Sequence, residues 1–136
     1  MEQLVIPAEA KRLDEVLSFV DRVLSEYDCP IETQIQIDIA VEEIYVNIAN
    51  YAYNPETGDA TITCTVEKDP LRVIIEFSDG GIKYNPLDRD DPDLALSAEE
   101  RDIGGLGIYM VKTSMDNVSY RYEDGKNIFT IEKKLG

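Results

Sequence analysis

The sequence contains no histidine and only two cysteines among its 136 residues. Histidine is the commonest general base and metal ligand, so acid-base chemistry here falls to Asp, Glu, Lys, Tyr or Cys. Cys29 and Cys64 have neither the spacing of a metal knuckle nor that of a redox pair, and two cysteines form no disulfide framework. We expect both to be reduced and partly buried.

Positive charge is also scarce, because the chain has 13 basic and 28 acidic side chains and a net charge of −15. Such a chain repels a phosphate backbone, which argues against a nucleic-acid partner. A phosphate ligand would need a cation and local hydrogen-bond donors. No long apolar run and no basic segment followed by an apolar one is present, so we expect no membrane span, no secretory signal and a cytoplasmic protein.

The length of 136 residues fits one domain, residues 1–136, with a single core. Apolar residues recur at helical spacing in two segments near the N-terminus, and the period then changes to that of strands. This order predicts an α+β fold: a two-layer sandwich with a mixed, mainly antiparallel sheet and three helices on one face. The expected strands are 2–6, 60–69, 71–79 and a hairpin over 117–135, and the expected helices are 8–27, 30–53 and 106–116.

Residues 80–105 have no clear period, are acidic, and are too long for a plain connection in a compact domain. We expect a lid or binding loop, centred on about residues 82–103.

A polar stripe lies beside the apolar stripe of the second expected helix. Glu43, Asn47 and Asn50 stand at i, i+4 and i+7 and therefore point the same way. An Asn oxygen suits Mg²⁺, which takes few protein ligands together with substrate phosphates, and the Glu could accept a proton from a nucleophile. Glu42 lies about 100° around the helix, and the adjacent pair leaves open which carboxylate is the base. The alternative is a solvated helix edge.

Asp79 and Gly81 follow an apolar strand directly. Asp79 could accept a hydrogen bond from an exocyclic amine, and neighbouring glycines would let a flat ring approach the backbone. A simple turn is the other interpretation.

The stretch Gly104-Gly105-Leu106-Gly107 opens the last expected helix. Glycine inside a helix costs roughly 1 kcal/mol relative to alanine, and close approach of an anion to backbone N-H groups would explain that cost. The helix dipole contributes only about 0.3 to 1 kcal/mol, which is too little to hold a bare polyphosphate on so acidic a protein. Mg²⁺ is therefore required if a triphosphate binds. A hinge for the acidic loop is the alternative.

The order of these three stretches resembles the Bergerat-type ATP-binding domain of gyrase, heat-shock chaperones, histidine kinases and mismatch-repair ATPases. Over nearly the whole chain it is most similar to the bacterial anti-sigma factor serine/threonine kinases. VEEIYVNIANYAYNPETG resembles their first motif, SDGGIKYNP their second and GGLGIYMVK their third. The resemblance implies Glu43 as the base, Asn47 as the magnesium ligand with Asn50 beside it, and Asp79 with Gly81 at the adenine. It implies that residues 104–107, that is Gly104, Gly105, Leu106 and Gly107, surround the phosphates.

Two positions depart from that family's pattern. Tyr51 stands where relatives often have His, and Lys126-Asn127 stands where relatives tend to have Gly-Thr. Asn127 could still hydrogen-bond the adenine. Arg101, a basic residue close to the phosphate glycines, is the candidate partner of the γ-phosphate.

The resemblance implies a kinase that uses Mg²⁺ and ATP to phosphorylate a serine on a small anti-sigma antagonist (STAS-type) protein. It also implies a sigma factor as a second partner, a role in transcription regulation, and a homodimer. A catalytically silent ATP-binding switch with the same pocket is an alternative, and a purely structural interaction domain is another.

Overall fold

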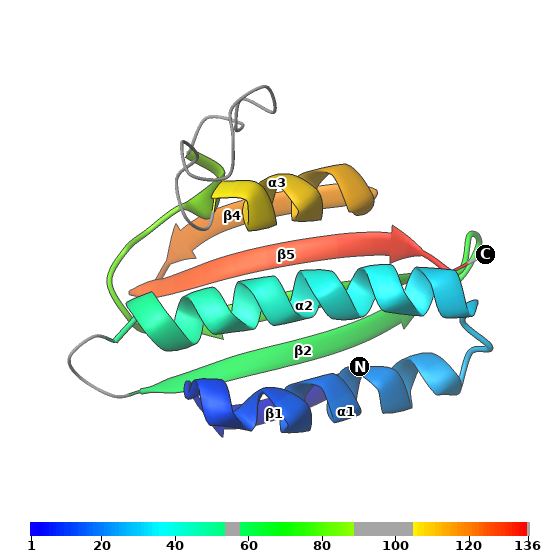
Figure 1. The fold of residues 1–136 in the computed structure, drawn as a ribbon, viewed down its shortest axis with the longest axis horizontal. Coiled ribbons are helices and arrows are strands. Elements are labelled where there is room, and N and C mark those ends of the chain that lie inside the picture. The colour runs from blue at the N-terminus through cyan, green and yellow to red at the C-terminus, as the bar shows by residue number, and fades with distance from the viewer. Residues whose placement is uncertain (54–57, 89–104, 136) are drawn as a thin grey trace.

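A computed structural model describes residues 1–53, 58–88 and 105–135. Two helices follow the first strand, two strands come next, and a third helix precedes a final hairpin (Figure 1). The elements are β1 (Glu2–Pro7), the 3₁₀ turn η1 (Ala10–Arg12), α1 (Leu13–Ser25), α2 (Ile31–Tyr51), β2 (Asp59–Glu67), β3 (Arg72–Asp79), the 3₁₀ turn η2 (Pro86–Asp88), α3 (Gly105–Ser114), β4 (Asn117–Glu123) and β5 (Lys126–Lys134).

The strands form one sheet in the order β1-β2-β3-β5-β4, and α1, α2 and α3 cover one of its faces (Figure 1). The predicted α+β two-layer architecture is confirmed. Each neighbouring pair of these strands is antiparallel, so the sheet is antiparallel throughout rather than mixed. No helix within the described ranges is long and apolar enough to cross a membrane.

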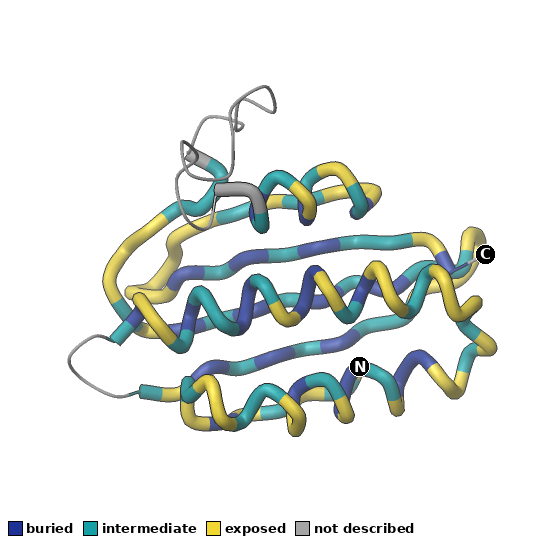
Figure 2. The backbone as a smooth tube through the Cα atoms, in the orientation of Figure 1, coloured by how far each residue is buried: buried dark blue, intermediate teal, exposed yellow. Residues whose placement is uncertain are grey.

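The core lies between the two layers. Val73, Ile75 and Phe77 alternate with partly exposed residues along β3 and are buried under the helices. Figure 2 shows the same alternation in the neighbouring strands, and buried positions on the helix sides that face the sheet.

The predicted helix over residues 8–27 begins later than expected. The chain makes only a 3₁₀ turn before α1 starts at Leu13. The reason is tertiary, because the buried Tyr45 hydroxyl accepts a hydrogen bond from the Glu9 N-H at 3.1 Å and lies 2.8 Å from the Glu9 carbonyl. Glu9 is thereby held in an extended conformation.

The last hairpin turns at Asp124 and Gly125, both of which have positive φ. This is the geometry of a two-residue turn that matches the twist of the flanking strands. Lys126 and Asn127 therefore belong to β5, and the register places Asn127 directly opposite Asp79 of β3.

Two carboxyl groups meet between α1 and α2. One oxygen each of Asp21 and Asp38 is buried and has no hydrogen-bond partner among the described residues as long as both carboxylates are ionised. Two ionised carboxylates can only accept, so a single proton shared between them satisfies both. Burial, the hydrogen bond with Asp21 and the charge of Asp21 raise the pKa of Asp38 to about 7.

This pair makes stability depend on pH. Because the pKa of Asp38 is raised on folding, protonation of Asp38 stabilises the folded protein. This stabilisation is fully present below about pH 4, the pKa in the unfolded chain, and is lost as pH rises through about 7. Because Asn mimics the protonated acid, we expect Asp38→Asn to raise the melting temperature more at pH 8 than at pH 5. Thermal unfolding at both pH values tests this, with Asp14→Asn on the exposed side of α1 as the matched control. Equal shifts at the two pH values would contradict the expectation.

Candidate functional site

A hollow opens between the C-terminal half of α2 and the strands β3, β5 and β4. Its empty volume is about 510 Å³, part of which is open to solvent. Three of the predicted site residues line it: Asn47, Asp79 and Asn127. The other lining residues are Ile44, Ile48, Tyr51, Ala52, Phe77, Ile82, Tyr84, Pro86, Ile108, Tyr120 and Phe129.

Asp79 and Asn127 are the buried polar side chains of the described part of the chain, 6% and 7% exposed respectively. Buried polar groups require partners, and these two partner each other, because Asn127 Nδ2 donates to Asp79 Oδ1 at 3.0 Å. The Gly81 N-H donates to the same oxygen at 3.0 Å. Both of these hydrogen bonds fall on Oδ1, which leaves Oδ2 as an acceptor for a ligand.

Gly81 allows the chain after β3 to cross the end of α2. A Cβ built on Gly81 would overlap the Ala52 carbonyl and lie 2.7 Å from the Ala52 Cβ. The next residue is anchored there, since the Ile82 N-H donates to the Ala52 carbonyl at 2.8 Å. Glycine at this position therefore serves the packing that brings Ile82 to the hollow.

Glu43 of α2 meets Gly107 of α3. Glu43 is half-buried, and a Cβ built on Gly107 would overlap its carboxylate. Burial, and next the charge of Glu42, raise the pKa of Glu43 above its usual range. Glu42 is exposed. The structure thus brings the first and third predicted motifs into direct contact through Glu43.

The two asparagines of the predicted polar stripe differ in position. Asn47 is half-buried, lines the hollow, and makes no side-chain hydrogen bond to another described residue. Asn50 is exposed and lies outside the lining. The helical twist between them turns Asn50 away from the hollow.

Five predictions fall at or beyond the ends of the described ranges. Arg101 and Gly104 lie outside the described residues, as does most of the expected lid over residues 82–103. α3 begins at Gly105, and the surroundings of Gly105 and Leu106 are likewise outside the description. Their predicted contacts with phosphates stay predictions.

Sequence reasoning missed most of the apolar wall. Ile44 and Ile48 belong to the apolar stripe of the second predicted helix, which the sequence assigns to the core, and no sequence pattern gives Tyr120 a role, although the alternation in β4 places it on the helix-facing side of the sheet. The alternation of β4 is the signal that could have found Tyr120.

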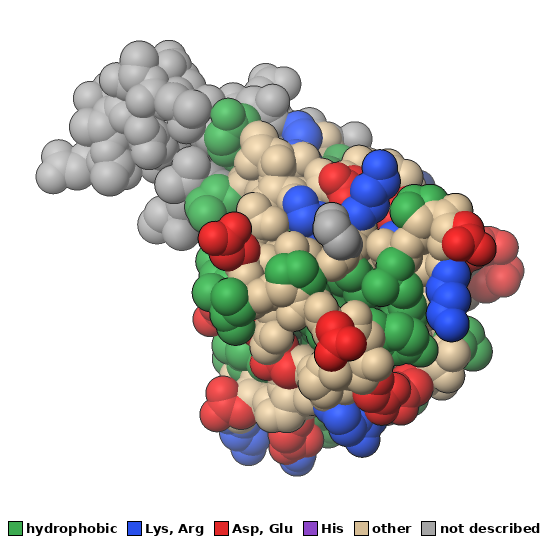
Figure 3. Space-filling view, turned by 90° about the vertical axis from the view of Figure 1, so that its right-hand side faces the viewer, with side chains coloured by type: hydrophobic (Ala, Val, Ile, Leu, Met, Phe, Trp, Pro, Cys, Tyr) green, Lys and Arg blue, Asp and Glu red, His purple; other side chains and the backbone are tan. Residues whose placement is uncertain are grey.

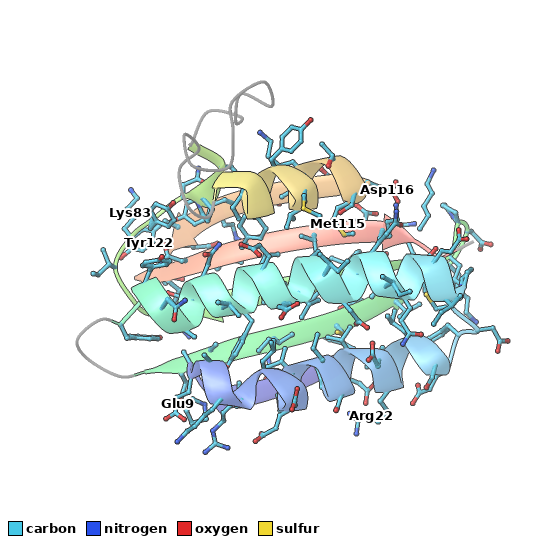
Figure 4. All side chains as sticks on the ribbon, viewed as in Figure 1. Glu9, Arg22, Lys83, Met115, Asp116 and Tyr122 are labelled. Atoms are coloured by element: carbon cyan, nitrogen blue, oxygen red, sulfur yellow. The ribbon has the colours of Figure 1, made fainter. Side chains whose placement is uncertain are left out.

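At the rim, Lys83 lies 5.1 Å from the centroid of the Tyr122 ring, and Figure 4 shows both side chains at the same edge.

The described part of the site supplies little positive charge. The four arginines in the described ranges, Arg12, Arg22, Arg72 and Arg121, each pair with a carboxylate. Figure 3 likewise shows Lys and Arg side chains next to Asp and Glu on the end of the molecule that faces the viewer. The lining of the hollow contains neither Lys nor Arg.

The chain belongs to the histidine kinase-like ATPase domain family, which it matches over residues 6–133. It is similar to the serine-protein kinase RsbW of Bacillus mycoides (strain KBAB4), with 24% identity over 135 residues that cover 93% of this chain and 80% of the relative. The serine-protein kinase RsbW of Listeria monocytogenes serovar 1/2a is 31% identical over 97 residues, covering 68% and 60% of the two chains. The predicted resemblance is thereby confirmed.

A solved structure supports the fold assignment. The histidine kinase domain of the Erythrobacter litoralis EL346 blue-light activated histidine kinase superposes with a TM-score of 0.56 at 15% identity, covering 96% of this chain and 62% of that one. This likeness shows the fold alone, and it confirms the predicted Bergerat-type architecture.

Proposed function

We propose that this protein is an ATP-dependent serine/threonine protein kinase of the anti-sigma regulatory type. The observation that carries the proposal is one hollow lined by both Asn47 and Asp79, with Glu43 one turn before Asn47 on α2 and against Gly107 of α3. This arrangement supports the roles proposed here: Asn47 as the metal ligand, Asp79 as the nucleobase acceptor and Glu43 as the base.

The hydrogen bonds around Asp79 support a nucleobase at this end of the hollow. Asp79 Oδ2 would accept a hydrogen bond from the exocyclic amine of adenine, because Oδ1 is already engaged by Gly81 and Asn127. Apolar side chains from both layers, including Ile48 and Phe129, would cover the faces of the ring. Hollows with apolar walls and a few placed polar groups are the usual form of such sites.

Asn47 would hold Mg²⁺. No cluster of three or more His, Cys, Asp or Glu side chains that could cage a metal occurs in the described ranges, and a single carboxamide fits a cation that keeps its waters and takes phosphate oxygens. When bound, Mg²⁺ supplies the positive charge that neutralises the phosphates. The arginines of the described ranges are each paired with a carboxylate, so the metal would supply positive charge that they do not.

Glu43 would orient and deprotonate the serine hydroxyl of the protein substrate. Burial raises its pKa, which makes the ionised carboxylate a stronger base near neutral pH. Phosphoryl transfer depends mainly on positioning and charge neutralisation, so the site needs no further catalytic side chain. The half-buried Glu43 favours this reading over a silent ATP-binding switch, which would have no use for a base.

The partners follow from the resemblance and from the relatives named serine-protein kinase. We propose a small STAS-type antagonist protein as the phosphoryl acceptor, a sigma factor as a second ligand, and a homodimer as the active assembly in the cytoplasm. Incubation with radiolabelled ATP and the small antagonist-like proteins encoded near this chain tests the first of these. Label on a serine of one of them is the expected result.

Calorimetric titration tests nucleotide binding itself. We expect heat on addition of ATP with Mg²⁺ and a loss of affinity of at least tenfold when EDTA removes the metal, because the described part of the site offers no Lys or Arg in its lining. Asn47→Ala should reproduce much of that loss, whereas Asn50→Ala, one turn further along and exposed, serves as its control. Absence of heat with Mg²⁺ and ATP would remove both the kinase and the switch.

A further inference from the structure

The side-chain amide of Asn127 is fully engaged by protein groups. Its Nδ2 donates to Asp79 Oδ1 at 3.0 Å and to the Ile82 carbonyl at 2.9 Å. Its Oδ1 accepts from the Tyr84 N-H at 3.1 Å and from the Tyr120 hydroxyl. An Asn amide has two N-H donors and two acceptor lone pairs, so none remains for a nucleotide.

The orientation of this amide is fixed by its neighbours. The Tyr84 N-H can only donate and the Ile82 carbonyl can only accept. A flipped amide would face donor to donor at Tyr84 and acceptor to acceptor at Ile82. The NH₂ group therefore has to point towards Asp79.

The fixed amide in turn fixes Asp79. Oδ1 of Asp79 receives the Asn127 and Gly81 N-H groups, so rotation of the carboxylate would break two hydrogen bonds in a buried site. Oδ2 is the oxygen that stays available in the hollow. It offers an acceptor and no donor to whatever binds there.

We propose that Tyr120 and Asn127 are positioning residues for nucleobase selection, which hold Asp79 so that the site accepts a 6-amino purine and rejects a 6-oxo purine. Neither side chain needs to touch the base. A 6-oxo group would bring its own acceptor against Asp79 Oδ2, and an unpaired buried acceptor is penalised. The proposal rests on the proposed function, since it presumes that the hollow holds a purine nucleotide.

The test compares ATP with inosine triphosphate, which carries oxygen in place of the 6-amino group. Calorimetry on the full chain with Mg²⁺ gives the two dissociation constants. The wild type should prefer ATP by at least tenfold. Asn127→Leu keeps the branched shape of the side chain, removes both donors and cannot share a proton with Asp79, so the preference should fall by about tenfold towards equality.

Two further variants complete the design. Tyr120→Phe removes one donor to Asn127, and the preference should fall by about two- to fivefold. Tyr122→Phe, on the same face of β4 but outside the hydrogen-bonded set, should keep the wild-type ratio. Thermal unfolding of each variant accompanies the titrations.

The ratio of the two constants separates a positioning role from a structural one. General loosening of the hollow would weaken binding of both nucleotides equally, so a folded Asn127→Leu protein with the wild-type ratio would overturn the proposal. If the Asn127 variant does not fold, Tyr120→Phe takes its place in the test. An unchanged ratio of the two dissociation constants in Tyr120→Phe would likewise overturn the proposal. If the wild type binds neither nucleotide, the proposed function itself fails, which is a distinct outcome.

Discussion

Replacement of Glu43 by Gln is expected to lower phosphoryl transfer by about 10² to 10⁴ while the affinity for ATP stays within about twofold. The amide keeps the size of the side chain and its place against Gly107, but it cannot accept a proton. Glu43 does not line the hollow, so nucleotide contacts should survive. Transfer to the antagonist-like substrate and calorimetric titration of ATP measure the two quantities separately.

Glu42→Gln is the matched control, because Glu42 is the exposed neighbour in the sequence. It should retain transfer and so decide which of the two carboxylates is the base. Gly107→Ala should also lower phosphoryl transfer, because its Cβ would occupy the place of the Glu43 carboxylate and displace it. If Glu43→Gln kept full transfer, the chain would be using another base, and if no variant or wild type showed transfer, the silent switch would be the better description.

The pH dependence of phosphoryl transfer also tests the assignment of Glu43 as the base. Burial and the charge of Glu42 raise the pKa of Glu43, and the protonated form cannot act as a base. Transfer should therefore fall as the pH falls through this raised pKa. Glu42→Gln removes one of the two causes, so the acid limb of its profile should lie at lower pH than that of the wild type.

Asp79→Asn is expected to weaken ATP binding by roughly 10- to 100-fold and to improve binding of 6-oxo purines such as GTP. Gly81 and Asn127 both donate to one oxygen of the side chain, so in the variant the carbonyl must take that place. The new NH₂ group then points into the hollow. There it opposes the 6-amino group of adenine and matches a 6-oxo group.

Asp59→Asn controls for the loss of one negative charge, because Asp59 is exposed at the start of β2 and lies outside the lining. It should bind ATP as the wild type does. Titration of both variants with ATP and GTP gives the comparison. Unchanged affinity and selectivity in Asp79→Asn would reject the role of this carboxylate.

Much of the site was predictable from local sequence patterns. Helical spacing placed Glu43 and Asn47 on one stripe, the end of an apolar strand marked Asp79, and the family resemblance then assigned these residues to the candidate site. Gly107 was predicted as a phosphate glycine, yet the structure adds that it makes room for Glu43. Gly81 was expected to admit a flat ring, and the structure shows the end of α2 in that place. In both cases the residue that the glycine contacts belongs to α2 or its end, far away in the sequence. Spacing along the chain cannot reveal such a contact.

The sequence by itself determined the order of helices and strands and the residue types available for chemistry, and it predicted the need for a metal beside so acidic a chain. These depend on periodicity, turn residues and charge, all of which are local or additive. The tertiary structure alone decided that Asn127 supports Asp79 from 48 positions away, that Tyr120 reaches the same amide, and that Asn50 turns outwards. Such contacts depend on the register of β3 with β5 and on how α2 packs over the sheet, because hydrogen bonds form only between groups that packing brings within about 3 Å.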